Sequence, residues 1–319
     1  MSGSLAAKRP PEADGTRVAT SQPSWRQRFN KRRVLKAITP WLFLALPLGL
    51  LILLTYLPAA NLIRYSFTSW DGIDPNKEWI GGANYQRLAT DPELYRVLLV
   101  SLFYLAGAFV QMAIALYFAT ILSFKVFAKN FFKGLIFFPY LLNGVAIGYV
   151  FLYLFRGGGT LDTTLAFFGI HDTPQWLGDP KLINASLAGV SVWRYTGLNF
   201  VLFLGAIQSI PSDLYEAAEL DGANTWHRFW YIILPGIRRV VALSFILAIS
   251  GALAVFEIPY VMTGGGNGSK TFAIQAIEMA FIHRKVGLAA AMSLVLLALV
   301  LLVTWIQRHF FPDERVELV

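Results

Sequence analysis

The segment with the clearest chemical pattern is a glycine-rich stretch at positions 264–271, which reads GGGNGSKT. Lys270 and Thr271 match the end of the phosphate-binding pattern G-x-x-x-x-G-K-[ST], but Ser269 stands where that pattern has its last glycine. A phosphate-binding loop of this kind follows a buried strand, whereas this stretch follows a long apolar run. We therefore expect a flexible external loop here, and no nucleotide site.

Other chemistry-bearing residues are sparse. The chain has no cysteine, which excludes disulfides, thiolate metal sites and cysteine nucleophiles. Glu257 is the one carboxylate inside the long apolar runs. Acid–base catalysis within a membrane would need a pair of carboxylates or histidines there. The four histidines lie in loops or at the ends of runs, without metal-ligand spacing: His171, His227, His283 and His309. The sequence therefore predicts no enzyme, no metal site and no cofactor.

Most of the chain consists of long apolar stretches. Hydrophobic residues make up 56% of the 319 residues and charged residues only 14%, too few for the surface of a soluble domain of this length. A bilayer core about 30 Å thick needs about 20 apolar residues in a helix. Six uncharged or nearly uncharged runs reach that length, at 41–63, 97–124, 135–155, 185–208, 240–262 and 286–306. We expect an all-α, polytopic membrane protein with six transmembrane helices.

Basic residues predict the orientation. With a cytoplasmic N-terminus, seventeen Lys and Arg residues fall on the inner side and nine on the outer side. Both termini are then cytoplasmic. We expect residues 1–36 to form a disordered basic tail, 37–312 the transmembrane domain and 313–319 a second cytoplasmic tail. The bias comes mostly from a cluster in the first tail: Arg26, Arg28, Lys31, Arg32, Arg33 and Lys36.

The inner segment at 209–236 has the composition of a helical hairpin. Ser212 or Asp213 can cap a first helix with acidic residues in it, and Gly222 breaks that helix. A second short amphipathic helix then runs to Pro235, which we expect to stop it. Such a hairpin, in a protein without catalytic groups of its own, favours docking to a cytoplasmic partner.

This hairpin resembles the EAA loop of ABC importer permeases. The matching positions are Glu216, Ala217, Ala218, Asp221, Gly222, Ile232, Leu234 and Pro235. The likeness extends from about residue 41 to the C-terminus and is greatest to the maltose-type sugar permeases. It rests on Trp193 and Gly197, on the stretch QSIP at 208–211 and on the stretch FEIPYVMTGGG at 256–266. Many of those permeases have a second proline after the glycines, where Asn267 stands here.

The resemblance implies a type I importer permease fold and a transport subunit of the cell membrane. In that family the loop is a coupling helix that sits in a cleft of a separate ATPase. Its partners would be a homologous second permease, two ATPase subunits and an extracytoplasmic solute-binding protein. The cargo would be a sugar, with a di- or oligosaccharide favoured.

Arg194 and Glu257 lie within or near apolar runs, so each should face a watery cavity or a partner, and they can pair with each other. Sugar sites combine polar groups for hydroxyls with aromatic faces. The candidates for lining the cargo path are Tyr140, Asn143, Trp193, Arg194, Tyr195, Asn199, Glu257 and Tyr260. Two alternatives stay open: an ABC permease for another solute such as glycerol phosphate, and an ion-coupled secondary transporter.

Overall fold

The computed structural model describes residues 39–41, 43–124 and 127–310. Apart from turns and loops, these residues are helical, with one isolated antiparallel bridge between Thr68 and Trp79. The predicted all-α class is therefore confirmed for the described residues. The predicted tails at 1–36 and 313–319, including the basic cluster, lie outside them. The chain divides into two units, Met1–Ala59 and Ala60–Val319, and the second contains the packed helices.

Helices long and apolar enough to cross a membrane account for five of the six predicted spans. In the described part of the chain they cover Thr39–Ser66, Pro92–Ser123, Ile183–Gln208, Arg238–Thr263 and Val286–His309. The first includes a π-helical turn, η1 (Ile52–Tyr56), followed by α2 (Leu57–Ser66). Each predicted range lies within a few residues of the helix that the structure has.

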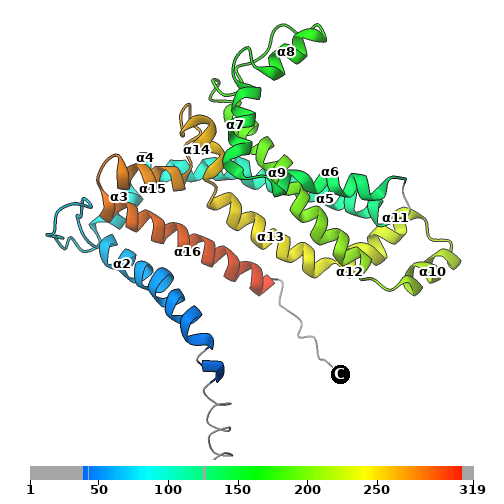
Figure 1. Ribbon diagram of the computed structural model, residues 1–319, viewed down its shortest axis with the longest axis horizontal. Helices are drawn as coiled ribbons and strands as arrows, with labels where there is room; N and C mark the ends of the chain where they lie inside the picture. The colour runs from blue at the N-terminus through cyan, green and yellow to red at the C-terminus, as the bar shows by residue number, and fades with distance from the viewer. Residues whose placement is uncertain (1–38, 42, 125–126, 311–319) are drawn as a thin grey trace, which may run out of the picture. The chain divides into compact units, whose positions relative to one another are not determined.

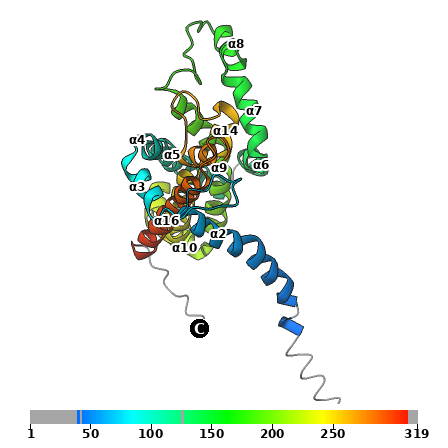
Figure 2. The same cartoon turned by 90° about the vertical axis from the view of Figure 1, so that its left-hand side faces the viewer.

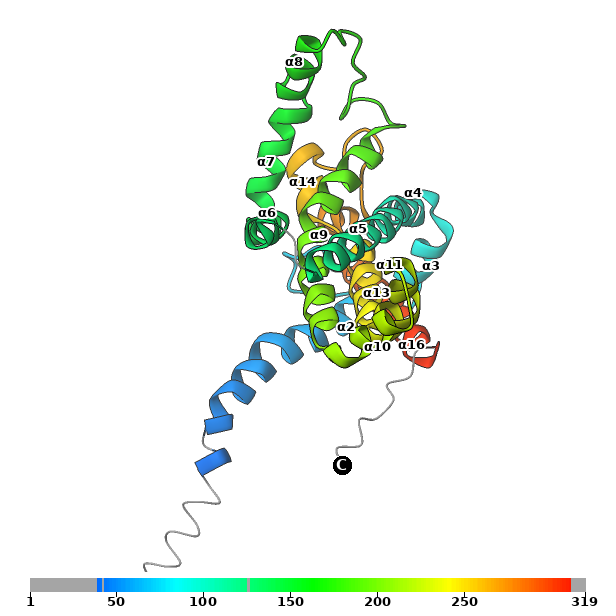
Figure 3. The same cartoon turned by 90° about the vertical axis from the view of Figure 1, so that its right-hand side faces the viewer.

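The third predicted span is not one straight helix. Instead, α6 (Lys129–Leu141) and α7 (Gly144–Phe155) meet at an angle of 97°. Leu142 and Asn143 are extended, and the Asn143 side chain accepts a hydrogen bond from the Val145 amide, 2.9 Å away, which caps α7. Apolar composition predicts where a segment is buried, but this cap decides where the helix bends. Figures 2 and 3 show α8 (Thr160–Phe167) continuing from α7 and extending beyond the other helices.

Small residues hold the central helices together. Helix α5 (Val100–Ser123) packs along α9 (Ile183–Gln208), and a Cβ on Gly107 would lie only 3.1 Å from Val192. On another side of α9, a Cβ on Gly197 would lie 2.7 Å from the Ile136 carbonyl of α6. Without water to drive apolar faces together in lipid, such close backbone approach supplies the packing contacts. These glycines therefore fix the spacing of α5, α6 and α9.

The fifth predicted span is interrupted near one end. Helix α13 (Arg238–Leu253) packs beside α5, where the Phe109 and Phe245 rings meet edge to face at 5.2 Å. It ends at Ala254, and α14 (Glu257–Thr263) begins after a non-helical Phe256. Helix α14 lies against α7, and a Cβ on Gly148 would come within 2.7 Å of Val261. This break places Glu257 on the first turn of a new helix.

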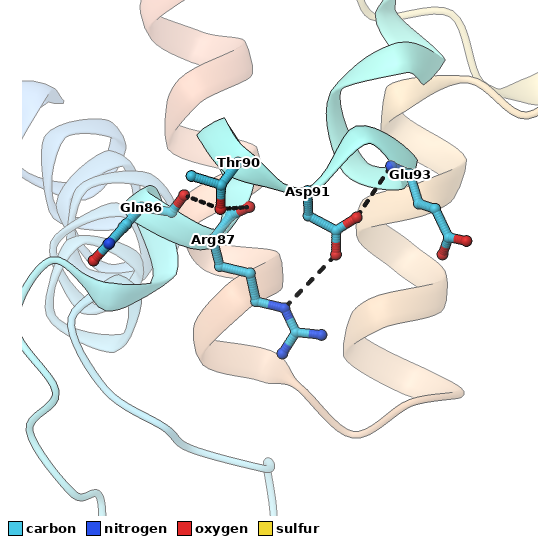
Figure 4. Close-up of polar contacts among 5 residues, drawn as sticks. All are labelled: Gln86, Arg87, Thr90, Asp91 and Glu93. Carbon is cyan, nitrogen blue, oxygen red and sulfur yellow. Dashed lines mark hydrogen bonds and ion pairs between the residues drawn. The ribbon is translucent and has the colours of Figure 1, made fainter.

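One end of the second unit is built from short helices, as Figure 1 shows. These are α3 (Ala83–Thr90), α4 (Pro92–Tyr95), η2 (Arg96–Leu99) and α15 (Phe272–Phe281), next to the start of α16 (Val286–Phe310). Asp91 links the first two: its carboxylate accepts a hydrogen bond from the Glu93 amide at 3.1 Å and lies 4.0 Å from Arg87 (Figure 4). The cap starts the helical run that continues into α5.

Candidate functional site

The hairpin at 209–236 begins with α10 (Ser212–Leu220), which ends in a tight turn at Gly222. Gly222 has φ +74°, its amide donates to the Glu219 carbonyl at 3.1 Å, and the Ala223 amide donates to the Ala218 carbonyl at 2.8 Å. This is the Schellman pattern, in which a left-handed residue after the helix lets two amides reach the last free carbonyls. The predicted break at Gly222 is confirmed.

The second arm of the hairpin consists of α11 (Thr225–Arg228), the π-helical η3 (Phe229–Ile233) and α12 (Leu234–Gly236). Asn224 caps it, accepting from the His227 amide at 2.9 Å. Pro235 does not stop this arm, because it sits in the first turn of α12, where no backbone N–H is needed; the break comes at Ile237. The predicted N-cap was also wrong, since Pro211 holds that position and makes no side-chain bond there.

Aromatic side chains on one side of the hairpin pack against the helices, while apolar side chains on its other side are exposed. Tyr215 meets Phe124 edge to face at 6.2 Å, and this burial raises the pKa of the Tyr215 hydroxyl. Arg228 of the second arm lies 3.4 Å from Glu219 of the first. In contrast, Leu220 is 90% exposed, and Trp226, Trp230 and Tyr231 are also exposed. The described part of the chain leaves these apolar groups in the open.

The predicted coupling residues divide by exposure. Glu216, Ala217, Asp221, Gly222 and Pro235 are exposed, whereas Ala218, Ile232 and Leu234 are half-buried. The exposed members lie on the same hairpin as the uncovered aromatic groups. Figure 1 shows α10, α11 and α12 gathered at one end of α5, α9 and α13. The hairpin therefore offers an acidic and apolar surface at the end of three apolar helices, and its Ile233 packs in the same core cluster as residues of α5 and α9.

A cavity of about 310 Å³ lies between α5, α9, α13 and the start of α14. Its size is at the lower limit of small-molecule sites, which run from about 300 to 1,000 Å³. Arg194 of α9 and Glu257 of α14 meet in its wall, with Nη1 and Oε2 2.9 Å apart. The predicted pairing of these two residues is present, and both border a cavity. A Cβ on Gly144 of α7 would overlap both side chains, so α7 closes over the pair.

Four of the eight predicted lining residues border this cavity: Arg194, Tyr195, Asn199 and Glu257. The other four do not border it. The Tyr140 ring lies 6.3 Å from that of Tyr195, and Asn143 caps α7. Trp193 packs on Phe151 at 5.2 Å, and Tyr260 stacks on Phe256, which does border the cavity, at 4.9 Å.

Tyr104, Gln111, Ser191 and Ser244 also border the cavity, and sequence reasoning missed them. Gln111 gave a usable signal, because an amide inside an apolar span is costly unless it faces water, a ligand or another polar group. Tyr104 and Ser244 gave none, since tyrosine and serine occur in many spans for packing reasons. The hydroxyls of both have no hydrogen-bond partner among the described residues.

The glycine-rich segment is not the flexible loop we expected. Asn184 donates to the Gly268 carbonyl and Asn267 to the Leu177 carbonyl, both at 3.0 Å. Lys270 forms an ion pair with Glu278 at 2.5 Å, so the residue that would hold a phosphate is already neutralised. The segment ties α14 and α15 to the first turn of α9 and to the stretch before it.

Comparison with known proteins gives the family of this chain. Residues 111–316 match the family described as "binding-protein-dependent transport system inner membrane component". The "probable ABC transporter permease protein YurN" of Bacillus subtilis is 32% identical over 88% of this chain and 98% of its own length. The "multiple sugar-binding transport system permease protein MsmF" of Streptococcus mutans is 30% identical, covering 86% of this chain and 96% of its own.

A third relative differs in the cargo that its name states: the "sn-glycerol-3-phosphate transport system permease protein UgpA" of Agrobacterium fabrum is 28% identical over 88% of this chain and 96% of its own. Among solved structures, a chain of a bacterial ABC transporter for the import of the acidic polysaccharide alginate superposes with a TM-score of 0.76. It covers 87% of this chain and 98% of its own length at 19% identity, which shows a shared fold. The predicted importer-permease fold is confirmed, and this chain is a multi-pass membrane protein that belongs to the family of binding-protein-dependent transport system inner membrane components.

Proposed function

We propose that this chain is the permease subunit of an ABC importer that carries a sugar across the cytoplasmic membrane, driven by ATPase subunits that dock on the hairpin at 209–236. The hairpin is the observation that carries this proposal. It presents Glu216 and Gly222 beside uncovered apolar groups such as Leu220 and Trp226, at one end of the helices that border the cavity. A partner that moves the hairpin therefore moves the walls of the cavity.

The proposed partners are a second permease, two ATPase subunits and a solute-binding protein. The cavity lining combines apolar residues with neutral polar and aromatic ones such as Gln111, Asn199 and Tyr195, and this mixture supports a sugar as cargo. The name of UgpA keeps glycerol phosphate as the second candidate. Coupling through the hairpin favours ATP over an ion gradient as the energy source, in contrast to a secondary transporter.

Uptake by the reconstituted complex tests the energy source. We expect proteoliposomes that hold this chain, its second permease, the ATPase and the binding protein to accumulate a labelled oligosaccharide only with ATP on the hairpin side. Uptake should persist after ionophores collapse the ion gradients and should cease when the ATPase is omitted. ATP-independent uptake that stops with the ionophores would instead identify an ion-coupled transporter.

The orientation follows from the same proposal. With the hairpin in the cytoplasm, the distribution of basic residues puts both termini on the cytoplasmic side. Because the chain has no cysteine, one introduced thiol reports its own side. Tyr231 on the hairpin is 78% exposed and Phe167 on α8 is 85% exposed. We expect an impermeant thiol reagent added to intact spheroplasts to label Phe167→Cys but not Tyr231→Cys, and to label both after lysis. Labelling of Tyr231→Cys before lysis would place the hairpin outside and refute the docking proposal.

A further inference from the structure

The cavity between α5, α9, α13 and α14 has no net charge. Among the described residues that border it, Arg194 and Glu257 are the only ones with charged side chains, and they neutralise each other at 2.9 Å. The other polar groups are neutral: two tyrosines, two serines, one glutamine and one asparagine. A ligand in this cavity therefore meets hydrogen-bonding groups but no excess of either sign.

Several of these groups have unused hydrogen-bonding capacity. The Arg194 side chain is only 13% exposed, and its Nε–H has no acceptor among the described residues. The hydroxyls of Tyr104 and Ser244 are also without partners, in residues that are 5% and 1% exposed. Buried polar groups are satisfied in almost all structures. These three atoms are covered by neighbouring side chains, so water or a ligand in the cavity can reach them only when those side chains shift.

The donors and acceptors left over suit hydroxyl groups. Glu257 uses Oε2 for Arg194, and its side chain is 49% exposed, which leaves the carboxylate able to accept a further bond. The Arg194 Nε–H can donate one when a side-chain shift uncovers it. A hydroxyl both donates and accepts, so neighbouring hydroxyls can use both sides of the ion pair at once. A carboxylate or phosphate on the cargo only accepts, and Glu257 would repel it while the guanidinium is already engaged.

We propose that the Arg194–Glu257 pair makes this cavity selective for uncharged, polyhydroxylated cargo, and that Glu257 is the residue that rejects anionic sugars and sugar phosphates. This inference rests on the proposed transport function and narrows it. The chain would then differ in cargo charge from the relative named for glycerol phosphate and from the structural neighbour named for alginate. Removing the carboxylate alone should convert the neutral cavity into one that attracts anions.

Charged thiol reagents can measure the cavity charge without any transport. Gly251 borders the cavity and has no atom within 4 Å of the position a Cβ would take, so a cysteine fits there. In the assembled complex, we expect Gly251→Cys to react with anionic sulfonatoethyl and cationic trimethylammonioethyl methanethiosulfonate at similar rates, after correction for each reagent's rate with a free thiol. The natural absence of cysteine from this chain keeps the readout specific.

Replacing either member of the Arg194–Glu257 pair should shift the ratio of the two reaction rates, in opposite directions. Adding Glu257→Gln should raise the anionic-to-cationic rate ratio about a hundredfold, because a unit charge acting over about 12 Å in an effective dielectric constant of about 20 changes the rate of each reagent about tenfold, in opposite directions. Arg194→Gln should lower the ratio by a similar factor, and the double variant should restore it. Phe167→Cys on α8 serves as the control whose ratio should stay constant in all backgrounds. A ratio that already favours the anionic reagent in the unmodified pair, or that ignores Glu257→Gln, would overturn the inference.

The cargo gives a separate test. A panel of labelled maltotriose, sorbitol, trigalacturonate and glycerol 3-phosphate should show ATP-dependent import only of uncharged members by the intact complex. Import of trigalacturonate or glycerol 3-phosphate would refute the charge inference and leave the permease function standing. If ATP drives import of no panel member while the thiol ratios shift as expected, the sugar-import proposal fails and the neutral cavity remains.

Discussion

Replacing Gly222 by aspartate is expected to reduce ATP-driven uptake by at least about a hundredfold, the size of effect seen when an interface loses a hot-spot contact. Gly222 has φ +74°, a conformation that costs most residues roughly 1–2 kcal/mol but that aspartate visits more readily. No atom of the described chain lies within 4 Å of the position a Cβ would occupy. The hairpin can therefore keep its turn, and the new carboxylate projects into the space that we assign to the ATPase.

A matched control separates this effect from backbone strain. Gly169 has φ +85°, open space around its Cβ position and a place in the loop after α8. Gly169→Asp should therefore transport at nearly the normal rate. The measurement is initial uptake per membrane-inserted complex, together with copurification of the ATPase. Full-rate uptake by Gly222→Asp, or equal losses in the two variants, would remove the docking role from the hairpin.

Glu216→Lys provides a second variant of the same surface. Glu216 is exposed on α10 and makes no ion pair with any described residue, so its reversal should leave the hairpin folded. Loss of ATPase copurification in this variant would point to a charge contact with the partner. Glu78→Lys, also exposed but in the segment between α2 and α3, is the matched charge reversal and should leave copurification unchanged.

The sequence predicted the positions of the helices better than their shapes. Apolar runs located the five long helices and the bent pair α6 and α7, because burial in lipid demands long stretches without charge. The bend at Leu142 and Asn143 was missed, since a single capping side chain interrupts a run whose composition does not change. The helix break before Glu257 was not predicted for a similar reason: Ala254, Val255 and Phe256 are as apolar as the helix before them.

The candidate sites show the same division. Arg194 and Glu257 could be paired from sequence because charges in apolar segments need partners, and few were available. The helix end at Gly222 could be predicted from the residue type, because many helices end at a residue in the left-handed conformation, which glycine adopts easily. Tyr104 and Ser244 could not be found, since nothing in their spacing shows that α5 and α13 face one cavity. Which side of α9 carries Arg194 and which carries Trp193 depends on packing that a single sequence does not encode locally.

The second large effect is expected at Gly144, the first residue of α7. An added Cβ would overlap the Glu257 carboxylate and the Arg194 guanidinium, so Gly144→Ala should push the two side chains apart while sparing the helix. Because the half-exposed pair would no longer join α9 to α14, we expect uptake to fall about tenfold, which corresponds to about 1.4 kcal/mol in the barrier of the transport cycle. Membrane level and ATPase copurification should not change.

Gly134→Ala is the matched control, because it adds the same methyl group to α6 with no atom within 4 Å. It should transport normally. Shortening the acid should also relieve the overlap, so Gly144→Ala combined with Glu257→Asp is expected to recover part of the lost uptake. A destabilised helix would gain nothing from that second change, and recovery therefore distinguishes displacement of the pair from misfolding. If Gly144→Ala alone transports at the normal rate, the contact between α9 and α14 through Arg194 and Glu257 is not needed for the transport cycle, and its contribution to the cavity is limited to charge.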